Sequence, residues 1–484
     1  MPHVPLLALT ATATPEVAED IQRRLGFVKP NVMRGDFMRG NLAYVVRNVN
    51  DKDGELVRII KGVHGCAIVY VRRRSATLDV AALLDGCGIR ALPYHAGMTV
   101  QERNANQEAW MSGKVTAIVA TNAFGMGIDK PDVRVVVHYD VPDSPEAYFQ
   151  EAGRAGRDGQ RSYAVLLANG FALRTLRGRV AKQFPSLEKI REIYSSLCDY
   201  FNLLEGEGME SSFPFDKESF CKVSGSAPDV VSSAMMLLQG AGYIEVAGDL
   251  RNKGRLVFKV ERRELDRLDL DGTQERVVEF FLRNMSGVFS GFVYFSEAEV
   301  AGELGMERDG LYDVLLKLSR EGVVVYVPGD HAECVVMKQP RMPESYVELP
   351  YEVYGRRKEA YRKRIEAMAA YITSEGECRQ RFLMRYFGME GSEDCGVCDV
   401  CLGKKKQHKL HAHVDREVVR LLERNGTMDL HELTAAFNGA VPAGKDVQKE
   451  EMEAGQHEVI DALRRLLDSG RISYSALSKV SLNK

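Results

Sequence analysis

Two arginines, Arg154 and Arg157, stand three residues apart in a stretch rich in glycine. Upstream, Ser144 followed by Pro145 is typical of a helix N-cap and a first helical position, so we expect a helix that ends near Ala152, where the glycines begin. A guanidinium group stays charged at any working pH, and its planar fork matches two phosphate oxygens. Paired arginines at a loosened helix end therefore indicate the stabilisation of a transferring phosphoryl group. The alternative is a solvated loop of arginine and glycine.

Four cysteines form a second group that could do chemistry. Cys378, Cys395, Cys398 and Cys401 are separated by sixteen, two and two residues, so the last three lie on two overlapping Cys-x-x-Cys turns. Four thiolates suit tetrahedral Zn2+, and a closed shell of sulfurs leaves no position for water, so we expect a structural metal. The alternatives are a redox dithiol and an iron–sulfur cluster.

Short β-branched runs alternate with helical segments between residues 55 and 168. This alternation predicts an α/β fold with a doubly wound parallel sheet and right-handed crossovers. The expected strands are 66–71, 90–94, 115–121, 133–139 and 162–167. Ligands gather at the carboxyl ends of such strands. The residues expected there are Arg72, His95, Thr121 and Gly127.

Three motifs resemble the second half of the motor of RecQ-type superfamily 2 DNA helicases, and they occur in the same order. They are LTATAT (9–14), ATNAFGMGIDKP (120–131) and GRAGRDG (153–159). Residues 361–402, which include the four cysteines, resemble the zinc-binding subdomain of the same family. The resemblance implies a RecA-like sheet.

The resemblance also implies how a nucleotide is handled. ATP with Mg2+ is expected between two RecA-like domains of the full-length protein. Arg154 and Arg157 are expected to stabilise charge on the γ-phosphate, and Gln150 to link the nucleotide to the domain interface. Gly127, whose backbone amide can approach a phosphate, and Asp129 are expected to face the same cleft.

DNA, single-stranded and forked or duplex, is the partner that the resemblance implies, with 3'-5' unwinding in repair and recombination. Thr121 is expected to contact the DNA backbone, together with Arg72 and His95. For Arg72 the alternative is a solvated basic loop, and for His95 it is an ordinary hydrogen-bonded histidine at a strand end.

A helix, a glycine and a short strand recur in this order three times after about residue 174, which is typical of winged helices. In the first two units we expect two strands joined by a polar turn, and in the third a helix and one strand. The ranges are 243–246 with 256–260, 323–327 with 334–337, and 457–467 with 472–474. Arg251 and Lys253, in the first wing, favour DNA binding there. The alternative is that these units pack against other proteins.

The resulting order of domains begins with a remnant of a first RecA-like domain, followed by the second RecA-like domain. A helical linker with the first winged-helix-like unit, a second such unit, a zinc module and a C-terminal winged-helix-like unit then follow. The expected boundaries are 1–35, 36–175, 176–265, 266–345, 346–405 and 406–484.

The sequence contains neither Gly-x-x-x-x-Gly-Lys-Ser/Thr nor Asp-Glu-x-His, the segments that hold nucleotide phosphates and magnesium in such motors. We therefore expect a truncated or mis-started helicase that hydrolyses little or no ATP alone. The alternative is a non-enzymatic DNA-binding or regulatory protein that uses a helicase-derived scaffold.

Composition limits the class of protein. The formal net charge of −3 gives no global attraction to nucleic acid, so phosphate contacts must come from local basic clusters. No apolar run is long enough to span a bilayer, and residues 1–9 lack the basic start and cleavage site of a signal peptide. We expect a cytoplasmic protein, associated with the nucleoid if bacterial, with no membrane role.

Overall fold

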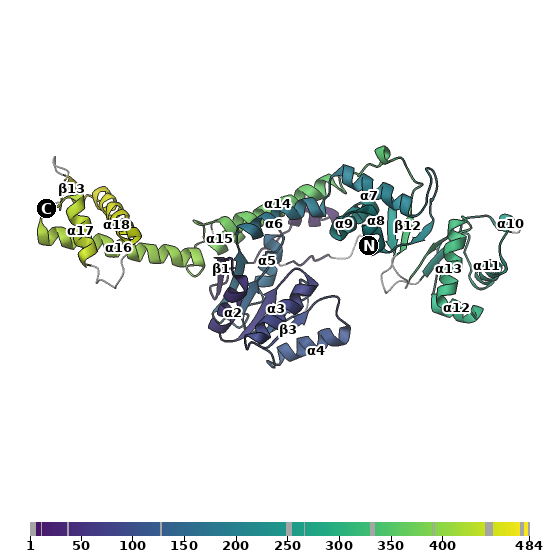
Figure 1. The fold of residues 1–484 in the computed structure, drawn as a ribbon, viewed down its shortest axis with the longest axis horizontal. Helices are drawn as coiled ribbons and strands as arrows, with labels where there is room; N and C mark the ends of the chain where they lie inside the picture. The colour runs from purple at the N-terminus through teal and green to yellow at the C-terminus, as the bar shows by residue number, and fades with distance from the viewer. Residues whose placement is uncertain are drawn as a thin grey trace. The chain divides into compact units, whose positions relative to one another are not determined.

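A computed structural model of the chain separates into two compact units, which Figure 1 draws with their elements labelled. The first unit is formed by residues 1–169 and 370–484, and the second by residues 170–369. The structure describes residues 6–10, 12–35, 38–125, 128–247, 254–265, 267–329, 334–389, 391, 393–440, 449–474 and 479–482.

The first unit contains a six-stranded sheet of order β1-β6-β5-β2-β4-β3, in which every pair of neighbours runs parallel. Its strands are β1 (Leu42–Asn48), β2 (Cys66–Tyr70), β3 (Ala91–Tyr94), β4 (Ala117–Ala120), β5 (Val133–His138) and β6 (Ser162–Ala168). Strands β2 and β4 are buried along their whole length, as expected of central strands covered on both faces. The predicted α/β class and parallel RecA-like sheet are confirmed.

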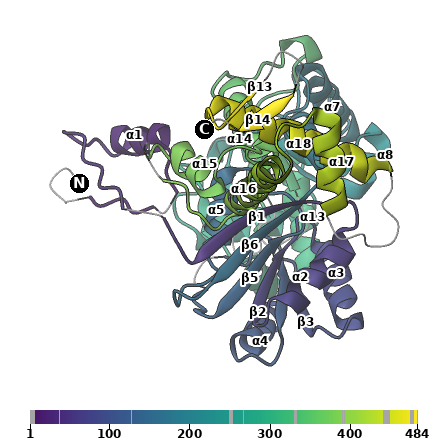
Figure 2. The same cartoon turned by 90° about the vertical axis from the view of Figure 1, so that its left-hand side faces the viewer.

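Helices connect these strands and cover the sheet. They are α2 (Lys52–Gly62), α3 (Arg74–Gly86), α4 (Val100–Met111) and α5 (Pro145–Ala152). Leu56 of α2 and Leu84 of α3 share one buried core with Val69 of β2 and Val137 of β5. Figure 2 shows α2 and α3 on the same side of the strands.

Local capping signals predict the start of α5 correctly. The Ser144 hydroxyl accepts the backbone N–H of Ala147 at 3.2 Å, and Pro145 occupies the first turn. The helix ends at Ala152, immediately before the glycines. The position of the arginine pair after a helix end is therefore confirmed.

In the N-terminal segment, the apolar residues 4–9 predict a strand and residues 15–25 a helix, and the described residues agree only with the helix. The expected helix forms as α1 (Pro15–Arg24), with Thr14 as its N-cap. However, no strand includes any of the described residues Leu6–Thr10, so the expected strand is wrong over these positions. A strand needs a neighbour for its backbone groups, and no strand pairing given for the described residues reaches this segment.

The rest of the first unit follows residue 370. It contains the end of α14 (Gly355–Thr373), then α15 (Arg379–Tyr386), α16 (Asp399–Asn425), α17 (Leu430–Ala440), α18 (Lys449–Asp468), β13 (Ile472–Tyr474) and β14 (Val480–Leu482). Strands β13 and β14 pair antiparallel beside the apolar faces of α16, α17 and α18. The helix and strand predicted for the third winged-helix-like unit thus lie within α18 and β13.

The second unit begins with helices and contains two small sheets. Its helices are α6 (Gly170–Gln183), α7 (Leu187–Tyr200), α8 (Lys217–Ser224), α9 (Pro228–Gly240), α10 (Arg262–Leu265), α11 (Gly272–Asn284), α12 (Glu297–Leu304), α13 (Arg308–Arg320), the 3-10 turn η1 (Glu344–Tyr346) and most of α14. Its strands are β7 (Ser212–Pro214), β8 (Ile244–Ala247), β9 (Gly254–Phe258), β10 (Val293–Phe295), β11 (Val324–Val327) and β12 (Cys334–Met337).

The two sheets show that one winged helix is inserted into the other. Strand β8 pairs with β12, and β9 pairs with β10 and β11. The first sheet therefore has the order β7-β12-β8 and the second the order β10-β9-β11. The predicted strand pairs, 243–246 with 256–260 and 323–327 with 334–337, are wrong. The whole second winged helix therefore lies between β8 and β12, the two wing strands of the first winged helix. Strand β9 belongs to the sheet of the second winged helix.

Among the described residues, the structure has no helix whose length and apolar character would let it cross a membrane.

Candidate functional site

Arg154 lies almost buried behind the loop that follows β4. The residue is 8% exposed, and its Nε is a buried donor without a hydrogen-bond partner among the described residues. A Cβ built on Gly125 would stand 3.2 Å from Arg154 Nη2, so the guanidinium lies close against the backbone of Gly125. Burial raises the pKa of Tyr70, and the neighbouring Arg154 opposes that rise. Arg154 therefore carries its charge at the carboxyl end of β2.

Arg157 is the more exposed arginine, and it pairs with another predicted site residue. Its Nη1 donates to Asp129 Oδ1 at 2.6 Å, and the two side chains are 38% and 81% exposed. The structure thus brings Arg157 and Asp129 together. Gln150 is exposed on α5, one turn before Arg154.

Two residues that sequence reasoning missed hold the arginine loop in shape. Arg39 donates to the carbonyl oxygens of Gly153 and Gly156, and Asn41 Nδ2 donates to the Gly156 oxygen at 2.7 Å. Gly156 itself has a φ of +63°, the left-handed region that favours glycine. No local sequence signal identifies this support, because the partners are more than a hundred residues apart in the chain.

The predicted DNA-contacting residues of the sheet lie at the carboxyl ends of three adjacent strands. Arg72, Thr121 and His95 follow β2, β4 and β3. Thr121 is 7% exposed, and its hydroxyl accepts the backbone N–H of Ala123 at 3.5 Å, which helps to order the loop. His95 Nδ1 accepts the N–H of Gly97 at 3.2 Å.

Arg72 lines a cavity of about 260 Å³ at the ends of β2 and β5 and forms an ion pair with Asp143. The cavity is also lined by the polar residues Tyr70, Asn122, His138, Asp140 and Glu151. Beneath it, the buried His138 Nε2 lies 2.8 Å from Glu151 Oε2, which ties β5 to the last turn of α5. Three further predicted site residues, Gly127, Arg251 and Lys253, lie outside the described residues.

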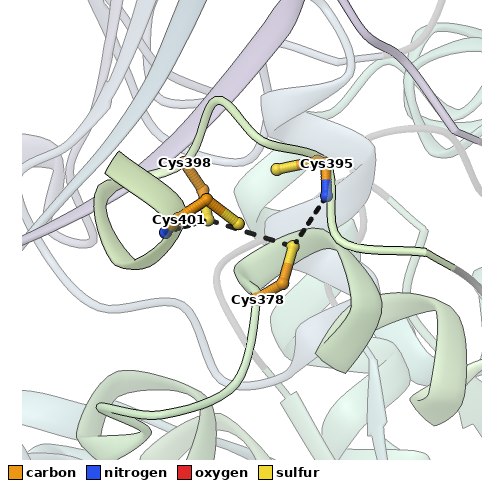
Figure 3. A group of neighbouring side chains, drawn as sticks. All are labelled: Cys378, Cys395, Cys398 and Cys401. Carbon is orange, nitrogen blue, oxygen red and sulfur yellow. Dashed lines mark hydrogen bonds between the residues drawn. The ribbon is translucent and has the colours of Figure 1, made fainter. Parts of the chain in front are cut away.

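The four cysteines converge, as Figure 3 shows. All four sulfur atoms lie within 4.8 Å of one another, and three of the four residues are buried. Cys378 Sγ accepts the backbone N–H of Cys395 at 3.3 Å and lies 3.9 Å from Cys398 Sγ. Hydrogen bonds from Cys395 and Cys398 hold the pKa of the Cys378 thiol well below its usual value. Four convergent cysteine sulfurs fit a structural Zn2+ site.

Residues next to the cysteines fasten this centre to the RecA-like sheet. Arg379, directly after Cys378, donates from Nε to Asp399 Oδ1 at 3.0 Å and from Nη2 to Asp399 Oδ2 at 3.2 Å. Asp399, directly after Cys398, also accepts the backbone N–H of Val46 in β1 at 3.1 Å. We did not identify Arg379 and Asp399 from the sequence, although their position beside metal ligands was a usable signal.

Aromatic residues join the same centre to α5. The Tyr371 hydroxyl donates to the Tyr148 hydroxyl at 3.3 Å, and Tyr386 donates to Glu146 at 2.8 Å. Burial raises the pKa of both Tyr148 and Tyr371, so their hydroxyls stay neutral. The helix that precedes the arginine pair is therefore supported by the cysteine module.

Three family models match separate parts of the chain. They are the helicase conserved C-terminal domain over residues 51–159, the RecQ helicase winged-helix domain of Bacteroidota over 256–328, and the RecQ zinc-binding domain over 336–402. The winged-helix match falls on the inserted unit, between β8 and β12.

Curated relatives agree with these matches. A putative ATP-dependent DNA helicase Q1 of Caenorhabditis briggsae is 45% identical over 207 residues, which cover 42% of this chain and 32% of the relative. The ATP-dependent DNA helicase RecQ of Pasteurella multocida is 43% identical over 166 residues, which cover 34% and 26%. The match thus spans about a third or less of these relatives.

Among solved structures, the chain is similar to S. cerevisiae Dbp5 bound to RNA and ADP BeF3, with a TM-score of 0.30 and 22% identity over 33% of this chain and 44% of that chain. The sequence matches bring a helicase domain, a RecQ winged helix and a RecQ zinc module together in one chain. Over these three segments, the chain is similar to RecQ-type helicases of superfamily 2.

Proposed function

We propose that this chain provides the second RecA-like domain, the winged helices and the zinc module of an ATP-dependent DNA helicase that unwinds DNA with 3'-5' polarity. The names of the relatives support ATP and DNA as ligands. ATP with Mg2+ is held opposite the arginine pair, and DNA runs across the carboxyl ends of β2, β4 and β3.

The observation that carries the nucleotide role is the unsatisfied donor of Arg154. Buried donors are almost always paired in folded proteins, so an Nε without a partner in a charged group indicates a ligand atom that completes the site. A phosphate oxygen at this position satisfies the donor and meets the positive charge where the transferring group gains negative charge.

The pair formed by Arg157 and Asp129 supports the same role. Exposed ion pairs contribute about 0–1 kcal/mol, so Arg157 can exchange Asp129 for a phosphate at little cost. Gln150 occupies the same helix end, and we assign it the contact between nucleotide and domain interface. Gly127 is assigned to the same cleft through its backbone amide.

Thr121, Arg72 and His95 are assigned to the DNA backbone, because all three follow adjacent parallel strands at the edge where ligands gather. Arg251 and Lys253 are assigned to duplex DNA ahead of the motor. Closing of the nucleotide cleft then moves the strand that these residues hold.

The first test is DNA-stimulated ATP hydrolysis by the 484-residue chain, with binding to forked DNA measured in parallel at stated salt. Because the sequence has no Gly-x-x-x-x-Gly-Lys-Ser/Thr segment, we expect DNA binding without turnover. ATP turnover by this chain that is lost in Arg157→Ala would show that a complete nucleotide site lies within these residues. That result would contradict the proposal that another domain holds the ATP phosphates opposite the arginine pair.

The arginine roles need a partner that holds ATP. We expect the chain to restore turnover to a separately purified first RecA-like domain of a RecQ relative, and Arg154→Lys or Arg157→Lys to lower that turnover by about a thousandfold or more. Arg161→Lys is the matched control, because Arg161 lies in the same loop but donates to the Val397 carbonyl at 3.3 Å. Equal losses in all three variants would remove the catalytic assignment.

A further inference from the structure

Two helices of the second unit concentrate positive charge in a chain that is slightly acidic as a whole. Helices α6 and α14 together carry ten basic residues and two acidic ones, whereas the chain has a formal net charge of −3. Four of the basic residues lie on α6, which has no acidic residue. Phosphate contacts by such a chain must use local clusters of this kind.

An ion pair places the two helices side by side. The guanidinium of Arg177 on α6 meets the carboxylate of Glu366 on α14, with Nε 3.2 Å from Oε1 and Nη2 3.2 Å from Oε2. This fork neutralises one of the two acidic residues and holds two cation-rich helices side by side. Their exposed basic residues are here called the α6–α14 surface.

Three arginines of this surface form no ion pair with the residues that the structure describes. Arg174, Arg357 and Arg362 are exposed, and none forms an ion pair with a carboxylate of the residues that the structure describes. Exposed cations elsewhere in the second unit are commonly neutralised, as in the pair of Lys317 and Asp271 at 2.8 Å. Unpaired arginines leave their full donor sets for an external anion.

The surface is also open between its cations. Arg357 and Arg364 lie seven residues apart on α14, which places them on the same side of the helix about 10 Å from each other. On α6, Gly178 follows Arg174 by one turn, and no atom lies within 4 Å of the position its Cβ would take. An extended polyanion can therefore approach the helix backbone between the arginines.

The recognition helices of the winged units do not offer this charge. Helix α9 has one charged residue, Asp229, and no basic residue. Helix α13 has three basic residues, of which Arg308 pairs with Glu297 and Lys317 pairs with Asp271 at 2.8 Å. Arg320 is exposed, as are Asp309 and Asp313. Neither helix carries a concentration of basic residues like that of α6 and α14.

We propose that the α6–α14 surface binds the phosphate backbone of nucleic acid without reading its sequence. Arginine forks match phosphate oxygens two at a time, and phosphate contacts fix position without carrying sequence information. The proposal rests on the proposed function only for the choice of nucleic acid as the polyanion. It assigns to two helices outside the RecA-like domain the contact that the winged helices were expected to make.

The experiment measures the affinity of the full chain for forked DNA between about 50 and 200 mM salt. The test variant combines Arg174→Ala, Arg357→Ala and Arg362→Ala, changes that keep helix propensity high. Each lost phosphate contact lowers the slope of log affinity against log salt by about 0.7–0.9, so we expect a slope lower by about 2 and at least a tenfold weaker affinity at low salt. Replacing the same three arginines by lysine should retain most of the slope.

The matched control removes three exposed charges of the same unit outside this surface, in Lys222→Ala, Arg263→Ala and Arg283→Ala. An equal loss in test and control variants, or an unchanged slope in the test variant, would overturn the assignment while leaving the proposed function in place. Absence of DNA binding by the unaltered chain would overturn both. Tighter binding to vesicles of anionic lipid than to DNA, lost in the test variant, would overturn the choice of nucleic acid.

Discussion

Asp399 accepts the backbone N–H of Val46 at 3.1 Å, so a residue beside Cys398 of the cysteine cluster closes a hydrogen bond on the edge strand of the RecA-like sheet. Edge strands present unpaired backbone donors, and a carboxylate satisfies one of them here. The same carboxylate holds Arg379, which is 6% exposed. The cysteine centre is therefore joined by hydrogen bonds to the domain that carries the arginine pair.

Removal of this carboxylate should destabilise the edge of the sheet. We expect Asp399→Ala to cost about 3–5 kcal/mol of local stability, because Arg379 stays buried without its counter-charge. Hydrogen exchange at the Val46 amide measures this directly in the full chain, and its protection should fall.

Glu352→Ala is the control, since it breaks the exposed ion pair with Arg356 and should cost less than about 1 kcal/mol. An Asp399→Ala chain with unchanged Val46 exchange would show that the hydrogen bond does not protect the strand.

Removal of the metal should loosen the structure at both ends of these contacts. We expect one Zn2+ per chain, and its loss to a chelator or in Cys395→Ser should raise hydrogen exchange both in α15 and at Val46. The physical reason is that Arg379 and Asp399 each follow a ligand directly and lose their relative position when the ligands separate. Elemental analysis of metal content accompanies the exchange measurement.

Cys221→Ser is the matched control, because Cys221 packs against an apolar core in the second unit and should keep its metal content. Full zinc content in Cys395→Ser would contradict the assignment of Cys395 as a metal ligand. Zinc loss without any change in exchange at Val46 would show that the metal does not stabilise the sheet edge.

Sequence patterns predict the parts of this protein that depend on neighbours in the chain. The spacing of Cys378, Cys395, Cys398 and Cys401 and the cap at Ser144 are local signals, and the structure agrees with both. The strand pairs of the winged units depend instead on residues about ninety positions apart, as with β8 and β12. A polar stretch of sequence after a strand is typical of a hairpin and equally of an entry point for an inserted domain, so the sequence alone does not distinguish them.

The arginine loop also combines a feature that local sequence signals predict with one that depends on distant residues. Its position follows from the capped α5, but its shape depends on Arg39 and Asn41, whose hydrogen bonds span more than a hundred residues. Neither residue lies in a motif or has a spacing that marks it. The glycines of the loop were visible in the sequence, but which of them is essential depends on the space around each one.

Gly156 and Gly159 provide a matched pair to test that space. Both have a positive φ, +63° and +79°, so alanine at either position costs about 1–2 kcal/mol from the backbone alone. At Gly156 an added Cβ would also stand 2.6 Å from Ser162 Oγ and 2.8 Å from Asn41 Nδ2, whereas at Gly159 nothing lies within 4 Å. Overpacking adds about 1–3 kcal/mol, so Gly156→Ala should lower thermal stability clearly more than Gly159→Ala. Because the displaced Asn41 holds the loop carbonyls, Gly156→Ala should also raise hydrogen exchange across residues 153–159. Equal stability losses in the two variants would show that the loop relaxes around the added methyl group and that the contacts of Asn41 do not fix the arginine pair.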